Sequence, residues 1–195
     1  MILYWVAGYL AGSLPFGLWI TRLVKNIDIR DGGSGHVTTT NTIRQAGFAP
    51  GAAVLILDIS KGFLPVYFSL RAGLPAWSVA ITAGLVVLGH CYPIFANFRG
   101  GMGLAAAGGT MFAANFTAAL IVLALLIFLV LIIRHSARAA LFTGLLAPFL
   151  LWLLQFRGTE LWVMAATGLV IAFRFTVDWD RKYRELWLDR DSEQT

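Results

Sequence analysis

A polar segment between two apolar stretches, residues 28–47, holds the side chains best suited to chemistry in this sequence. Glycines flank Ser34, and Arg44 follows near the end of the segment. Backbone N–H groups exposed by glycine, a hydroxyl and a guanidinium in one short loop are the donors that bind phosphate groups. The alternative is a flexible polar linker, which often has this composition. The anion-binding interpretation assigns contacts to Gly33, Ser34, Gly35, His36, Thr40, Asn41 and Arg44.

Two ionisable residues, Asp58 and Lys61, interrupt the apolar stretch 52–70. Their spacing of three places both side chains on one face of a helix. Charged groups inside an apolar span are costly and usually face the interior of a helix bundle. Lys61 is therefore a candidate phosphate partner, with Asp58 either holding it in place or acting on a proton. A structural ion pair, or a lysine that extends to the membrane interface, is the alternative.

A second glycine-rich segment, residues 89–103, begins with His90 and reaches Arg99 followed by glycines. Glycine lets the backbone approach a ligand closely, and a guanidinium grips phosphate through two parallel hydrogen bonds. The alternatives are a plain turn with one basic residue, and a histidine that only caps a helix. No other ligand stands at metal-binding spacing from His90, so neither a metal nor a cofactor is expected. The candidate residues are His90, Arg99, Gly100, Gly101 and Gly103.

The composition decides what kind of protein must position these groups. Of 195 residues, 58% are hydrophobic and only 13% are charged, and the mean hydropathy is +0.76. These values exclude an ordinary soluble domain and leave room for about six or seven membrane spans. The net charge of +5 then indicates contact with anionic lipid headgroups and not with nucleic acid. The single cysteine, Cys91, excludes an intramolecular disulfide.

The basic residues predict how the spans are oriented. Seven spans place twelve of the 15 Lys and Arg residues on one side and only Arg71 and Arg157 on the other. The positive-inside rule then puts the N-terminus outside, on an uncleaved first helix, and the C-terminus in the cytoplasm. We expect an all-α integral membrane bundle of about seven helices over residues 1–177, with a charged cytoplasmic or interfacial tail at 178–195. The apolar segments are 2–24, 52–70, 75–97, 103–114, 117–133, 139–156 and 160–175.

Four motifs in register, taken together, give the chain a family resemblance. They are GSLPFG at 12–17, GSG…TN…R at 33–44, DISKG at 58–62 and GH..P.F..F.GG.G at 89–103. In these the chain resembles the PlsY-type acyl-phosphate:glycerol-3-phosphate acyltransferases, small multi-pass enzymes of the bacterial inner membrane. The resemblance implies transfer of a fatty acyl group from acyl phosphate to the 1-hydroxyl of glycerol 3-phosphate, giving lysophosphatidate at the cytoplasmic face. It also implies that Ser34, Lys61 and Arg99 act on the phosphates.

Several positions depart from the family pattern. His36 replaces an asparagine, Met102 a lysine, Phe175 a histidine and Asp178 an asparagine. Fewer cationic groups should weaken the binding of a dianionic phosphate. Two other functions therefore stay open: a catalytically silent or acceptor-switched homologue that binds lipid or anionic headgroups, and a small transporter. The sequence shows no inverted repeat, which argues against transport. It predicts no oligomeric state.

Overall fold

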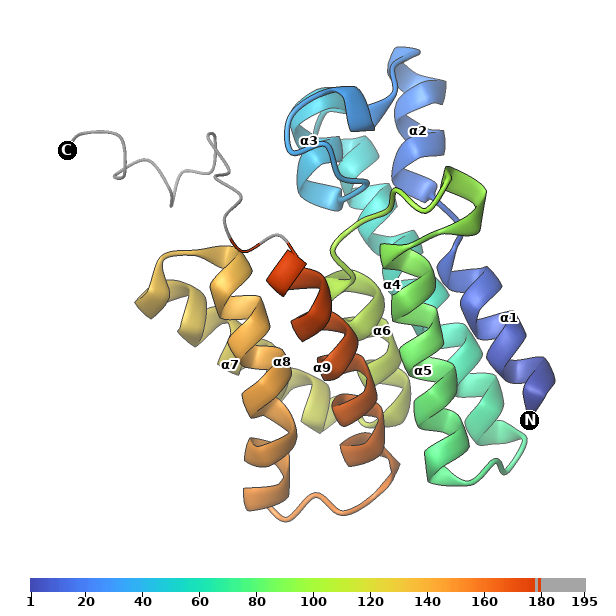
Figure 1. Ribbon diagram of the computed structural model, residues 1–195, viewed down its shortest axis with the longest axis vertical. Coiled ribbons are helices and arrows are strands. Elements are labelled where there is room, and N and C mark those ends of the chain that lie inside the picture. Colours follow the sequence, from blue (N-terminus) through green and yellow to red (C-terminus); the bar gives the residue numbers. More distant parts are fainter. Residues whose placement is uncertain (178, 180–195) are drawn as a thin grey trace.

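The computed structural model describes residues 1–177 and residue 179. Within this part the chain is helical and forms no strand, and Figure 1 shows its helices side by side. Two short 3-10 helices, η1 and η2, lie in the longer loops. The elements are α1 (Ile2–Gly12), α2 (Phe16–Lys25), η1 (Ile29–Asp31), α3 (Thr39–Ala46), α4 (Phe48–Arg71), α5 (Ala76–Cys91), η2 (Ile94–Ala96), α6 (Leu104–Ala114), α7 (Phe116–Ile133), α8 (Ser136–Leu153) and α9 (Thr159–Val177).

Six helical stretches within residues 1–177 are long and apolar enough to cross a membrane, which confirms the predicted all-α integral membrane fold. The first of them, Ile2–Lys25, contains both α1 and α2, with Pro15 at the break because proline has no amide hydrogen to continue the helix. The segment expected at 103–114 is the 11-residue helix α6, shorter than the roughly 20 residues that one crossing needs. The charged tail expected at 178–195 falls outside the described residues, except for Trp179.

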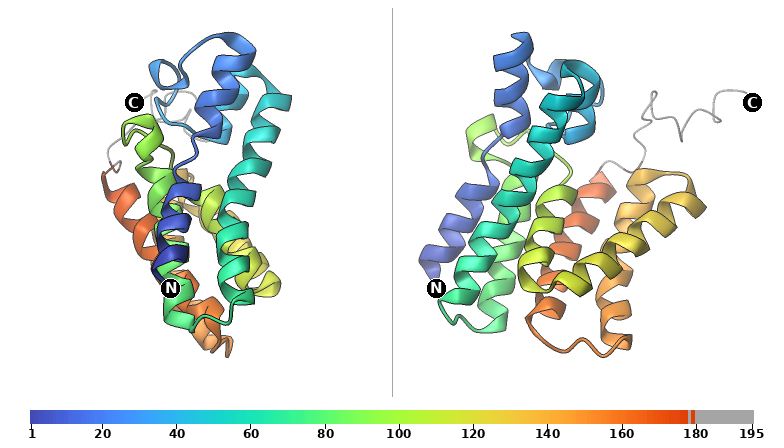
Figure 2. Two further views of the ribbon diagram at one scale, coloured as in Figure 1. Left: turned by 90° about the vertical axis from the view of Figure 1, so that its right-hand side faces the viewer. Right: turned by 180° about the vertical axis from the view of Figure 1, so that it is seen from behind.

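The chain runs back and forth, so its polar loops meet at one end of the bundle. Figure 1 shows the loops 26–47 and 92–103 and the last turn of α9 at the end opposite the N-terminus. α4 packs on α6, α5 packs between α1 and α9, and α8 packs on α9. α7 is tilted relative to the other helices, as the right-hand view of Figure 2 shows. The predicted polar segments therefore share one end.

Glycines let the central helices approach one another closely. A Cβ at Gly62 of α4 would collide with the backbone carbonyl of Ala106 on α6, and one at Gly109 of α6 would collide with that of Ile59. Small residues at such positions are typical of helix packing inside membranes. The contact fixes α6, and with it the glycine-rich loop that precedes α6.

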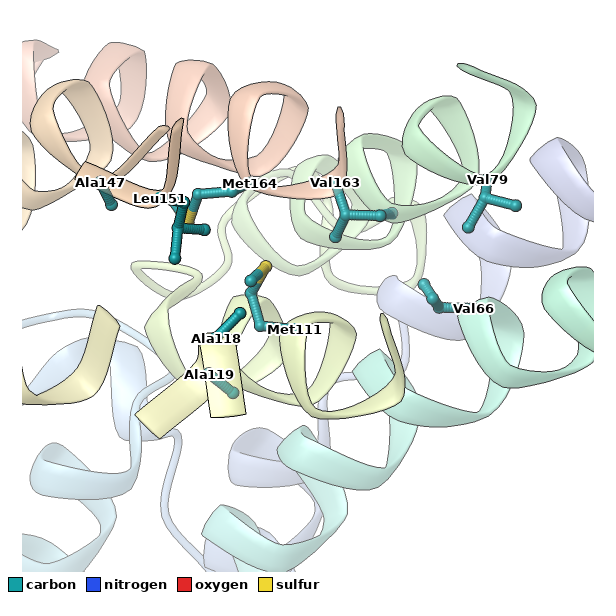
Figure 3. Packing of buried hydrophobic residues seen from close by; sticks show 10 residues of the cluster. Val66, Val79, Met111, Ala118, Ala119, Ala147, Leu151, Val163 and Met164 are labelled. Carbon is teal, nitrogen blue, oxygen red and sulfur yellow. The ribbon is translucent and has the colours of Figure 1, made fainter. Parts of the chain in front are cut away.

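A large apolar cluster fills the half of the bundle nearer the N-terminus. Figure 3 shows Met111 of α6 facing Leu151 of α8 and Val163 and Met164 of α9. The cluster also contains Val66 of α4. Most of the buried ionisable side chains among the described residues lie in the other half, where the loops converge, so the two ends of the bundle differ in chemistry. They are His36, Asp58, Lys61, His90 and Arg174.

Candidate active site

A buried lysine joins α4 to the break between α1 and α2. The ammonium of Lys61 donates to the backbone carbonyl of Leu14 over 2.7 Å and forms an ion pair with Asp58 Oδ1 at 2.9 Å. Both side chains are nearly inaccessible, with 4% of Lys61 and 3% of Asp58 exposed. The ammonium also lies 5.5 Å from the centre of the Phe16 ring. The ion pair therefore faces the interior, as the sequence predicted for charged groups in this span.

His90 completes this buried cluster from α5. Its Nδ1 lies 3.7 Å from Asp58 Oδ1, and no group in the described part of the chain forms a hydrogen bond with that nitrogen. A small cavity adjoins the cluster where the four sequence motifs meet. It is lined by Gly12, Leu14, Pro15, Val37, Lys61, His90, Pro93 and Gly100.

The polar loop before α3 is held in shape by a side chain of α3 itself. Asn41 is buried, and its Nδ2 donates to the carbonyls of Ile29, Gly32 and His36 over 3.0–3.2 Å. Gly33 has a positive φ of 58°, and a Cβ there would collide with the Asn41 amide. Asn41, which the sequence suggested as a phosphate contact, thus organises the backbone of the loop.

The loop leaves donors facing outward. Among the described residues, the N–H of the exposed Gly33 has no acceptor. The half-buried Ser34 donates its N–H to Asn41 Oδ1 over 3.3 Å, and its hydroxyl oxygen accepts from the N–H of His36. Thr40 is exposed at the start of α3, while the His36 side chain is buried. Arg44 lies half-buried in the last turn of α3. An N–H group and a hydroxyl at one surface suit an anion.

The glycine-rich loop lies directly against the first loop. The N–H of Val37 donates to the carbonyl of Gly100 over 3.2 Å, and the N–H of Gly101 donates to that of His90 over 3.0 Å. Gly103 has a φ of 87° and begins α6. Arg99 is exposed beside them. The structure therefore brings together the two segments that the sequence suggested separately.

One buried residue near these loops was absent from the predicted site. Arg174 of α9 donates from Nε to the carbonyl of Gly101 over 3.2 Å, and its guanidinium lies 5.7 Å from the centre of the Tyr92 ring. An arginine in the apolar stretch 160–175 was the available signal, because such residues usually face a bundle interior.

Two of the three departures from the family pattern that lie in the described residues, Met102 and Phe175, are close together. Met102 and Phe175 are buried in one apolar cluster with Val87, Cys91 and Ile171. Asp178, the fourth of these departures, lies outside the described residues.

The Arg30 side chain connects the start of the first loop to η2 through an ion pair and a backbone hydrogen bond. Arg30 binds both carboxylate oxygens of Asp28 over 2.7 and 2.9 Å and donates to the carbonyl of Ala96 over 3.0 Å. The Arg30 guanidinium and the N–H of Arg30 hold the pKa of the Asp28 carboxyl well below its usual range, and the pKa of Arg30 is raised in turn. Arg22, which is half exposed, also contacts Asp28.

Replacing Arg30 with methionine should lower the melting temperature, and the loss should depend on pH. Because the folded pKa of Asp28 is depressed, its ion pairs stabilise the fold fully above the ordinary aspartate pKa of about 4. That contribution fades as the pH falls below this value. Tryptophan fluorescence melts at pH 7 and near pH 3 should show a smaller gap between wild type and Arg30→Met in acid. Arg22→Met is the control and should change little, because its ion pair is exposed. A gap that widened in acid would contradict the assignment.

The fold and the site together define a multi-pass membrane protein with donors for anionic groups at one end of its helix bundle. The model of the family described as glycerol-3-phosphate acyltransferase matches residues 2–185. The chain belongs to this family. The glycerol-3-phosphate acyltransferase of Shewanella woodyi is 41% identical over 152 residues, covering 78% of this chain and 75% of the relative. The glycerol-3-phosphate acyltransferase of Shewanella oneidensis is 40% identical over 166 residues, covering 85% of this chain and 82% of the relative.

Solved structures agree with this family. The crystal structure of PlsY (YgiH), an integral membrane glycerol 3-phosphate acyltransferase, in its glycerol 3-phosphate form has a TM-score of 0.81 to this chain at 32% identity. The match covers 92% of this chain and 90% of that one. The lysophosphatidic acid form of the same enzyme has a TM-score of 0.78 at 31% identity, with the same coverage.

Proposed function

We propose that this chain transfers a fatty acyl group from acyl phosphate to the 1-hydroxyl of glycerol 3-phosphate, giving lysophosphatidate and inorganic phosphate. The observation that carries the proposal is the meeting of the loop 28–47, the Lys61 cluster and the glycine-rich loop at one end of a membrane bundle of this family. The glycerol 3-phosphate and lysophosphatidic acid forms of its structural relative contain the acceptor and the product of this reaction.

The chemistry requires two anionic substrates to be held side by side. The N–H of Gly33, the hydroxyl of Ser34 and the guanidinium of Arg99 would bind and neutralise their phosphates, which supports catalysis by alignment and by electrostatic stabilisation. The hydroxyl oxygen attacks the acyl carbon, and the bond from that carbon to the phosphate oxygen breaks. The departing phosphate can take the hydroxyl proton, so no covalent enzyme intermediate is needed.

The remaining predicted residues divide by what they contact. Thr40 and Arg44 stay proposed substrate contacts, as does His36, which is buried at the turn before α3. The other candidates also stay proposed substrate contacts, and their observed contacts support the loop backbone or the ion pair of the site. They are Gly35, Asn41, Asp58, His90, Gly100, Gly101 and Gly103.

Lys61 was expected to bind phosphate directly, and this stays a prediction. Two contacts of its ammonium, to Leu14 and to Asp58, support a positioning role that holds the α1–α2 break against α4. Its charge is matched by Asp58, which lessens its pull on a phosphate outside the cavity.

The acyl chain would occupy an apolar cavity of about 100 Å³ between α6, α7, α8 and α9. Its walls run along α6 from Leu104 to Met111, and Ile171 of α9 closes the end next to Gly103. The cavity thus leads from the glycine-rich loop into the apolar half of the bundle. A hydrocarbon chain placed there would carry its acyl carbon at the polar end.

The orientation in the membrane follows from charge. Arg22, Lys25 and Arg134 lie at helix ends on the same end of the bundle as the candidate site, whereas Arg71 and Arg157 lie at the opposite end. This asymmetry supports a site at the cytoplasmic face of the inner membrane and an external N-terminus. We treat residues 1–177 as one transmembrane domain and residues 178–195 as a charged cytoplasmic or interfacial tail.

The test is phosphate release by the purified protein in lipid, with acyl phosphate given with and without glycerol 3-phosphate. We expect release that depends on glycerol 3-phosphate, with lysophosphatidate formed. Ser34→Ala should lower kcat/KM about a hundredfold, the usual loss for a donor to developing charge. Ser60→Ala is the control, because the Ser60 hydroxyl only bonds to its own helix. Release stimulated only by another alcohol would indicate a switched acceptor, and folded protein without turnover would indicate the silent homologue.

A further inference from the structure

Two side-chain amides, one helical turn apart on α3, contact the same two carbonyls of the first loop. Gln45 donates from Nε2 to the carbonyl of Ile29 over 2.9 Å and to that of Gly32 over 3.0 Å. Asn41 donates to both of these oxygens over 3.1 and 3.2 Å. The side chains therefore form a double clamp on the backbone of residues 29–32. Asn41 belongs to the motif at 33–44, whereas Gln45 lies outside all four sequence motifs.

Gln45 also orients Asn41. Its Nε2 lies 3.1 Å from Asn41 Oδ1, the oxygen that accepts from the N–H of Ser34 over 3.3 Å. If the Asn41 amide were rotated by half a turn, its NH₂ group would face the two N–H donors of Gln45 and Ser34. Gln45 thus selects the orientation in which Asn41 accepts from Ser34 and donates to the loop carbonyls.

The clamp decides which backbone groups face outward. Carbonyl oxygens carry partial negative charge and would repel an anion, while N–H groups attract it. Gln45 and Asn41 bind the carbonyls of Ile29 and Gly32, and the N–H of Gly33 remains at the surface. Gly32 lies directly against Gln45, since a Cβ there would come 2.9 Å from Gln45 Oε1.

We infer that Gln45 is a positioning residue, which sets the loop 29–36 in the conformation that binds the phosphate group of a substrate. The inference rests on the proposed function, because it takes that loop as the phosphate site. It predicts that Gln45 acts on substrate affinity without touching substrate. The half-buried amide of Gln45 donates to the carbonyls of Ile29 and Gly32 and to Asn41 Oδ1, so its hydrogen bonds act on the loop and on the residue that holds the loop.

The test compares Gln45→Met, which keeps the length of the side chain, with Gln45→Glu, which also keeps an oxygen but loses both N–H donors. We expect Gln45→Met to raise the KM of one phosphate substrate about tenfold with kcat within about twofold, because the lost bonds misalign the loop. Gln45→Glu should raise that KM further, since its carboxylate meets the carbonyls of Ile29 and Gly32. The melting temperature should stay within a few degrees. Amide hydrogen exchange of residues 29–36 should be faster in both variants.

Gln155→Met is the matched control, because Gln155 lies in the loop between α8 and α9 at the opposite end of the bundle. It should leave both KM values and the exchange of residues 29–36 unchanged. Unchanged KM values in Gln45→Met, or a joint fall of kcat and melting temperature, would overturn the inference. If the wild type had no turnover, the proposed function would fail by itself. Exchange of residues 29–36 and titration with inorganic phosphate would then still decide the role of Gln45.

Discussion

Replacing Gly101 with alanine is expected to lower kcat/KM about a hundredfold while the protein remains folded. The new Cβ would collide with Nε2 of His90 and with the carbonyl oxygen of Val37, so the glycine-rich loop must move. That movement would disturb the bond from Arg174 to the Gly101 carbonyl and shift Arg99. A misplacement of about 1 Å in such a site can reduce the rate a hundredfold.

The measurement is the steady-state rate of lysophosphatidate formation by wild type and variant in the same lipid. Gly84→Ala is the matched control, because a Cβ at this position in α5 would meet Ala166 Cβ at 3.6 Å, an ordinary contact. Near-normal activity of Gly101→Ala would show that the two loops do not depend on this close approach. An equal loss in Gly84→Ala would show that the helix, and not the loop, is sensitive.

The membrane fold could be predicted because it follows from composition and charge. Long apolar stretches must form helices in lipid, where every backbone polar group needs a partner within the chain. The spans found at Phe48–Arg71 and Thr159–Val177 agree with this reading. The count of seven spans is not confirmed, because α6 has only 11 residues and packs by its glycines against α4. Hydropathy does not reveal such a contact.

The site was predicted only in part. The residue types and the shared end of the bundle followed from the motifs and from the alternating direction of the spans. The partners of Lys61 and Arg174 could not be predicted in this way, because they are distant in sequence. Leu14 is 47 residues from Lys61, and Gly101 is 73 residues from Arg174. Gln45 was missed for a similar reason. The sequence does not indicate a role for one amide on a short polar helix, because its partners in the loop are brought close only by folding.

Asn41 shows that a motif residue can have a structural role that the motif alone does not reveal. A small polar residue beside glycines suggests a ligand contact, yet its amide is used by three loop carbonyls. Buried polar groups must be hydrogen-bonded, and a tight loop leaves several carbonyls without helical partners. The need to satisfy the loop therefore explains Asn41 as well as a bound phosphate would.

Replacing Lys61 with methionine is expected to destabilise the fold by about 3 kcal/mol. Removing one partner of a buried ion pair leaves the other charge uncompensated, and such losses are about 3–5 kcal/mol. Asp58 would lose its ammonium partner with only 3% of its side chain exposed, and the Leu14 carbonyl would lose a donor. Unfolding titrations in mixed detergent would measure the change. Lys25→Met, on the exposed end of α2, is the control and should change little.

The double variant Asp58→Leu/Lys61→Met separates the charge effect from the loss of packing. Removing both charges leaves no uncompensated ion, and apolar replacements of buried ion pairs are often neutral. We therefore expect the double variant to recover most of the stability that Lys61→Met loses. The remaining deficit would measure the bond from Lys61 to Leu14, since methionine cannot donate to that carbonyl. If the double variant instead lost more stability than Lys61→Met does, Asp58 would not depend on Lys61 for its stability in the fold. The cluster would then owe its stability to other contacts, with His90 the nearest candidate at 3.7 Å.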